Sequence, residues 1–68
     1  YDASVVVQIR HRYEALAPAM DERLRRQWAA AEAQSLGRGG VSAVALATGM
    51  SHNTIDRGLM EIDRKSVV

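Results

Sequence analysis

Ser51, His52 and Asp56 are the residues of this chain whose types and spacing could support chemistry. In a nucleophilic site, a histidine takes the serine proton and a carboxylate orients the histidine. Adjacent residues at the start of a helix do not readily aim a serine at a histidine, and no oxyanion hole is evident. Capping of a helix by Ser51, with a surface contact between His52 and Asp56, is the better interpretation. We therefore predict that the chain is not an enzyme.

Metal and acid–base chemistry are no better supported by the sequence. The chain has no cysteine, and its two histidines, His11 and His52, stand far apart, so they do not form a zinc ligand set. Asp21 and Glu22 are neighbouring carboxylates, but at the start of a helix such a pair more often complements the helix dipole than performs catalysis. We expect neither a metal nor another cofactor.

The segment around Ser51 also carries side chains that can recognise DNA. Asn53 can form a bidentate contact with adenine, and Arg57 can bind guanine or a phosphate. Asp56 repels phosphates unless it accepts from a cytosine amino group or is neutralised by a neighbouring cation. Two serines at helix N-termini and an arginine in a glycine-rich loop could bind the DNA backbone. The predicted DNA-binding residues are Ser51, His52, Asn53, Asp56, Arg57, Arg38 and Ser42.

A helix-turn-helix over residues 41–60 would position these side chains. Gly49 suits the turn because it tolerates a left-handed backbone. Ala45 and Gly58 are small enough for the two helices to cross closely, and Ile55 begins the stripe that faces the core. In such a motif, the N-terminal part of the second helix enters the major groove.

The whole chain, residues 1–68, is predicted to be a single all-α domain, a small bundle of about four helices. The expected helices are 5–17, 20–36, 43–48 and 52–63. Ser4 and Ser42 are the predicted N-caps of the first and third helices. Pro18 should end the first helix, and Gly37 should end the second.

The expected core face of the second helix follows a helical period of 3.6 residues. Its members are Met20, Leu24, Trp28, Ala31 and Ser35. Hydrophobic residues make up 47% of the chain, which favours a folded domain, but aromatic residues make up only 4%. The core must therefore consist of aliphatic side chains and alanines around a single tryptophan.

The charge balance gives only weak support for a nucleic-acid partner. The net charge is +1, whereas DNA-binding domains usually carry a clear cationic surplus. All but one of the nine basic residues are arginine, which suits phosphate and guanine better than lysine. The lack of cysteine fits a cytoplasmic protein, and no apolar run is long enough to span a membrane. We expect double-stranded DNA as the partner and no membrane association.

The segments RYEALAPAMDERLRRQWAAAEAQSLGRGGVSA and LATGMSHNTIDRGLMEI resemble the N-terminal region of bacterial insertion-sequence transposases of the ISAzo type. The likeness extends from about Gln8 to Ile62. It implies a helix-turn-helix domain that binds the ends of the mobile element. The catalytic domain, of the RNase H-like DDE class, would lie beyond Val68, and none of its acidic residues is expected here. Family members carry a basic residue at the positions of His52 and Asp56, so this chain departs from the pattern there.

Two further functions remain open from the sequence. The first helix and the alanine-rich second helix could form a protein–protein or homodimer module, with the helix-turn-helix serving only as structure. The same fold would also suit the DNA-binding domain of a transcriptional repressor. We expect the chain to be a fragment of a longer protein, and its downstream sequence would separate a transposase from a repressor.

Overall fold

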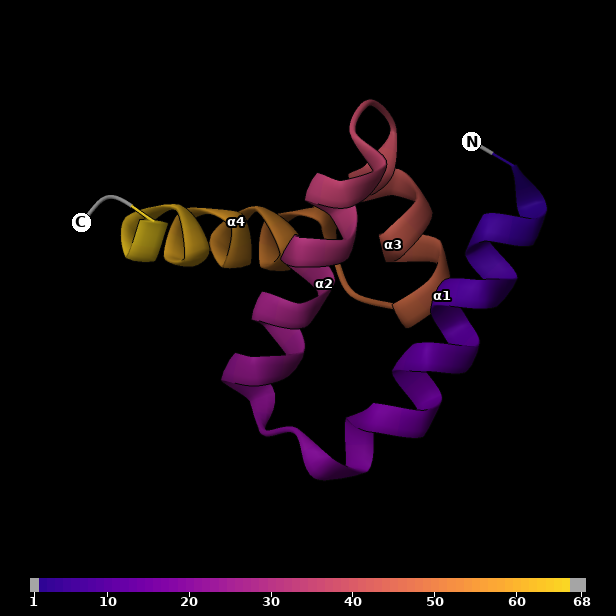
Figure 1. Ribbon diagram of the computed structural model, residues 1–68, viewed down its shortest axis with the longest axis horizontal. Coiled ribbons are helices and arrows are strands. Elements are labelled where there is room, and N and C mark those ends of the chain that lie inside the picture. Colours follow the sequence, from indigo (N-terminus) through magenta and orange to yellow (C-terminus); the bar gives the residue numbers. More distant parts are fainter. Residues whose placement is uncertain (1, 67–68) are drawn as a thin grey trace.

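The computed structural model describes residues 2–66, including the side chains of residues 2–63. Within this range the chain forms four α-helices, one short 3-10 helix and no strand, which confirms the predicted all-α class. The elements are α1 (Ala3–Leu16), η1 (Ala17–Ala19), α2 (Glu22–Leu36), α3 (Gly40–Thr48) and α4 (His52–Ser66). In Figure 1, α1 and α2 form the two sides of a V that joins at η1, α3 lies between their upper ends, and α4 crosses α2.

The first helix begins slightly earlier than predicted. Asp2 is its N-cap, because the Asp2 carboxylate accepts a hydrogen bond from the Ser4 backbone N–H at 3.1 Å. The prediction of Ser4 as the cap was wrong, since Ser4 lies inside the first turn and its amide is the group that needs an acceptor. The helix ends at Leu16 and Pro18 lies in η1, as the sequence predicted.

The second helix is bounded by an aspartate and a glycine. The Asp21 carboxylate caps the helix by accepting from the Leu24 N–H at 2.8 Å. Gly37 ends the helix, as predicted, with a positive φ of 74° that few other residues adopt. Its N–H donates to the carbonyls of Ala33 and Gln34, both at 3.2 Å.

The third helix begins at Gly40 with Gly39 as its N-cap, so the prediction that Ser42 caps this helix was wrong. Gly39 adopts a left-handed conformation with φ 80°, which turns the chain sharply enough for the helix to start early. Ser42 is consequently a half-buried residue of the first helical turn. Its backbone N–H lies in the first turn of the helix, where no backbone carbonyl of the same helix is available to accept a hydrogen bond.

The buried face of α2 is made of its alanines rather than its larger side chains. Ala29, Ala30 and Ala33 are buried, whereas Leu24 is 50% exposed and Ala31 is exposed. The predicted stripe that contained Leu24 and Ala31 was therefore wrong about which face meets the core. Small residues permit closer contact between helices than leucine does, and the two helices that pack against α2 both approach through a glycine.

Gly40 and Gly58 are the points at which α3 and α4 come closest to α2. A Cβ atom at Gly40 would meet the carbonyl oxygen of Ala33, and one at Gly58 would meet the carbonyl oxygen of Arg26. The sequence predicts a close crossing of the third and fourth helices at Gly58. Instead, α4 packs mainly against α2, and its contact with α3 is smaller. The inference of a close helix crossing at Gly58 was right, but its partner is a different helix.

The core contains residues from all four helices. Ile9 of α1, Val44 of α3 and Ile55 of α4 are fully buried, and they pack with the alanines of α2. Tyr13 and Trp28 fill the opening of the V, with ring centroids 5.6 Å apart and planes tilted by 41°. No helix in the described range is long and apolar enough to cross a membrane.

Candidate nucleic-acid interface

A three-residue turn positions α4 after α3. Gly49 has φ 78°, and its N–H donates to the Ala45 carbonyl at 2.9 Å, which ends α3 at the predicted residue. Ser51 then caps α4, since its Oγ accepts from the Thr54 N–H at 3.2 Å. This confirms the predicted cap. Ser51 Oγ also lies 2.9 Å from Thr54 Oγ1. The serine hydroxyl is thus committed to capping rather than to a nucleophilic site with His52.

The exposed face of α4 divides into two rows of side chains. His52, Asp56 and Asp63 lie within about 40° of one another around the helix axis, and we call them the acidic row. Asn53, Arg57 and Met60 lie within about 60° of one another on the adjoining side, and we call them the Arg57 row. Every residue in both rows is exposed, and the apolar side chain of Met60 is 63% exposed.

The two rows differ in what they can bind. The acidic row carries two carboxylates and one histidine, so it repels a phosphate backbone at neutral pH. The Arg57 row carries a cation, an amide that can recognise a base edge, and an apolar side chain that can contact a thymine methyl group. Of the two, the Arg57 row therefore has the chemistry that DNA requires.

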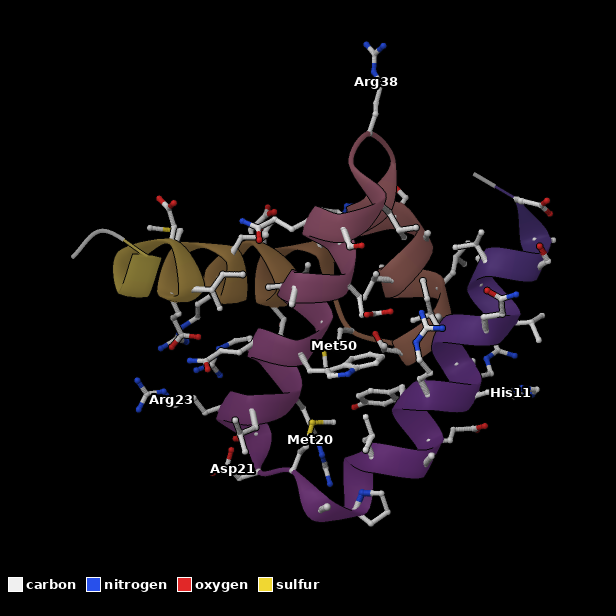
Figure 2. The ribbon with its side chains drawn as sticks, viewed as in Figure 1. His11, Met20, Asp21, Arg23, Arg38 and Met50 are labelled. Carbon is white, nitrogen blue, oxygen red and sulfur yellow. The ribbon has the colours of Figure 1, made fainter. Side chains whose placement is uncertain are left out.

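The structure separates two of the predicted residues from the rest. Ser42 lies in the first turn of α3 and Arg38 in the loop before it, whereas the residues of α4 follow the end of α3. Nine residues at about 1.5 Å each make α3 about 13 Å long, on the scale of a groove width. Arg38 projects from the tip of the loop between α2 and α3, away from the rest of the molecule (Figure 2). The predicted residues thus form two groups rather than one site.

Several arginines connect helices rather than lying free at the surface. These contacts are Arg10 to the Leu46 carbonyl (3.4 Å), Arg12 to the Glu32 carboxylate (2.5 Å), and Arg25 to the Ala17 carbonyl (3.0 and 2.7 Å). In the part of the chain whose side chains are described, Arg23, Arg38 and Arg57 form no hydrogen bond or ion pair. The sequence could not reveal this division, because the partners lie far away along the chain.

Glu61 pairs with Arg26 across the contact between α4 and α2. The guanidinium donates from Nε to one carboxylate oxygen at 2.6 Å and from Nη2 to the other at 2.9 Å. This bidentate hydrogen bond lowers the pKa of Glu61 and raises that of Arg26, and the nearby charges of Arg23 and Arg57 lower the pKa of Glu61 further. Arg57 is thus a neighbour of Glu61, but the direct partner belongs to α2.

Because folding lowers the pKa of Glu61, this pair stabilises the folded state above the unfolded pKa, about 4.3. The stabilisation is lost as the pH falls through the lower folded-state pKa. We expect Glu61→Gln to lower the melting temperature at pH 7, and the difference from wild type to shrink as the pH falls below the unfolded pKa of about 4.3. Circular-dichroism melts across this range test the prediction. Glu14→Gln, on the exposed face of α1, is the control. If the melting temperatures of wild type and Glu61→Gln differed by the same amount at every pH, the prediction would be contradicted.

A cleft of about 360 Å³ opens beside the Arg57 row, between α1, α2 and the beginning of α4. The residues that line it are Tyr13, Glu22, Arg25, Arg26, Met50, Thr54 and Arg57. Figure 2 shows Met50 between α1 and α2. This cleft could not be predicted from the sequence, because its lining residues come from three helices and a turn. In the described residues, no group of three or more histidines and carboxylates could hold a metal ion.

The cleft adjoins the Arg57 row, since Arg57 belongs to both. A scan against protein-family models and searches of curated proteins and of solved structures found no match to this chain. The likeness to ISAzo-type transposases therefore stays a prediction from the sequence.

Proposed function

We propose that this domain binds double-stranded DNA through α4, as the DNA-binding part of a transposase that recognises the ends of its own mobile element. The observation that carries the proposal is the N-terminal half of α4. It follows a tight turn, it is capped by Ser51, and it exposes Asn53 and Arg57 next to a cleft lined by arginines. Side chains at the beginning of a recognition helix are those that reach base edges in the major groove.

The packing of α4 supports this role because it fixes the helix without using its outer face. Ile55 is fully buried, Gly58 lies against the backbone of α2, and Glu61 is held by Arg26. These contacts leave the two exposed rows unobstructed by the rest of the described chain. Figure 1 shows that α4 crosses α2 and that the C-terminal part of α4 extends beyond it.

In this arrangement Asn53 reads adenine through paired hydrogen bonds, and Arg57 binds guanine or a phosphate. Met60, one turn further on, contacts a thymine methyl group. Asp56 and His52 lie in the acidic row and limit the affinity. Ser42 and Arg38, at the other end of α3, reach the phosphate backbone at a separate point.

The test is a fluorescence-anisotropy titration of the domain with an element-end duplex and with a scrambled duplex, repeated at several salt concentrations. We expect preference for the element end. Arg57→Ala should weaken binding and reduce the slope of log K against log salt by about 0.9, which corresponds to one phosphate. Equal affinity for both duplexes would contradict recognition of the element ends. An unchanged affinity and slope in Arg57→Ala would remove Arg57 from the interface.

A second candidate function is the protein–protein module, with self-association through exposed apolar side chains of α1 and α3. The alanine-rich α2 is less suited to this role than the sequence suggested, because Ala29, Ala30 and Ala33 are buried within the domain. Val7 of α1 is 50% exposed and Leu46 of α3 is 59% exposed, and the two helices pack against each other. Sedimentation of the same samples separates the two candidates. A concentration-dependent dimer without preference for any DNA would favour the protein–protein module, whereas a DNA-binding monomer would exclude it.

A further inference from the structure

We infer that the cleft between α1, α2 and α4 is a phosphate-binding site that holds one backbone phosphate of the duplex bound by α4. The DNA origin of this phosphate rests on the proposed function, whereas the affinity for phosphate rests on the cleft itself. Three arginines, Arg25, Arg26 and Arg57, line the cleft together with the half-buried Thr54. Arginine is the side chain best matched to phosphate, since its planar donors meet two oxygens at once.

Two of these guanidinium groups are already held in place by the fold. Arg25 donates from Nε and Nη2 to the Ala17 carbonyl, and Arg26 donates from Nε and Nη2 to the Glu61 carboxylate. A guanidinium has five N–H donors, so each group has three left for a ligand. Because their side chains are ordered before binding, little conformational entropy is lost when an anion arrives.

The charge balance of the cleft favours an anion. Arg25, Arg26 and Arg57 contribute three positive charges, against the carboxylates of Glu22 in the cleft wall and Glu61 in its pair with Arg26. A volume of about 360 Å³ is at the lower end of the usual range for ligand pockets, about 300–1,000 Å³. It therefore suits a phosphate with part of its sugar and not a whole duplex.

The position of the cleft determines how the duplex lies on α4. Arg57 belongs both to the cleft and to the row that contains Asn53 and Met60. A phosphate in the cleft therefore places the DNA on the α2 side of α4, with Asn53 towards the bases. The acidic row, which includes Asp56, then faces the opposite edge of the contact. This arrangement explains how a domain with a net charge of only +1 can bind DNA despite its exposed carboxylates.

The site can be tested without DNA by following NMR signals of the Thr54 amide and the arginine Nε–H groups during titration with inorganic phosphate, at ionic strength held constant with sodium chloride. We expect saturable shifts in the wild type. Arg57→Gln should weaken phosphate binding about ten-fold, because it removes one charged hydrogen-bond partner. Arg10→Gln removes the same charge from the exposed surface of α1, outside the cleft, and should leave the affinity unchanged. Glu22→Gln should strengthen binding a few-fold, since it removes a carboxylate from the cleft.

Shifts that never saturate, or equal losses in Arg57→Gln and Arg10→Gln, would overturn the site. A saturating amount of element-end duplex then identifies the source of the phosphate. If the duplex abolishes the response to free phosphate, the backbone fills the cleft as inferred. If the duplex binds and free phosphate still binds to the complex, the inference is wrong while the proposed function stands. If phosphate binds but no duplex does, the proposed function is wrong and the cleft takes free phosphate.

Discussion

Replacing Gly58 with alanine is expected to destabilise the domain by at least about 2 kcal/mol, a large part of the roughly 3–10 kcal/mol typical of a chain this size. The added Cβ would meet the backbone carbonyl oxygen of Arg26, which no side-chain rotation can move. The better helix propensity of alanine offsets only about 1 kcal/mol of the steric cost. For a domain of this length, the melting temperature should fall by about 8–16 °C, as measured by circular dichroism.

Asp63→Ala is the matched control for Gly58→Ala. It introduces alanine on the exposed face of the same helix, where no neighbour is displaced, and it should change the melting temperature by only a few degrees. A melting temperature for Gly58→Ala at or above that of the wild type would show that α4 and α2 do not approach closely. It would also undermine the position of the cleft, because the same helix contact brings Arg57 next to Arg26.

Asp56→Arg is expected to produce the largest gain in DNA affinity. The substitution changes the charge of the acidic row of α4 by two units. It does so at a position where the transposase family that the sequence resembles carries a basic residue. The new side chain can reach a phosphate, which should steepen the salt dependence by about 0.9 and raise non-specific affinity about ten-fold near physiological salt. Anisotropy titrations with element-end and scrambled duplexes measure both effects. A decrease in affinity would show that Asp56 makes a required contact with a base.

Asp63→Arg separates a local effect of Asp56→Arg from a general effect of charge. It makes the same change in charge in the same row, about two turns further along α4. If the beginning of α4 enters the groove, Asp56→Arg should raise the affinity clearly more than Asp63→Arg. Equal gains would mean that the duplex lies along the whole helix or contacts it only through long-range attraction.

Local signals predicted the elements of the fold well. Pro18, Gly37 and Gly49 each stand at a helix end, because their backbone preferences act without help from distant residues. The cap at Ser51 is local for the same reason. Ser4 and Ser42 show the limit of this reasoning, since an aspartate or a pair of glycines nearby provided an earlier start for the helix.

The arrangement of the helices was harder to predict, because it depends on which face of α2 meets its neighbours. A period of 3.6 residues fits the row that contains Leu24 as well as the row of alanines, and only the close approach of Gly40 and Gly58 decides between them. For a similar reason, the sequence could not predict which arginines form contacts within the fold and which do not. Arg26 lies far from Glu61 along the chain, and nothing local marks the two as partners.

The contact between Tyr13 and Trp28 provides the domain with an intrinsic fluorescence probe. Trp28 is the only tryptophan, and it lies on α2 against a tyrosine of α1. Its emission therefore reports whether the two arms of the V are together, while circular dichroism reports the helices themselves. Tyr13 also lines the cleft between α1, α2 and α4. Binding of a ligand in that cleft should therefore change the intrinsic fluorescence, without any added label.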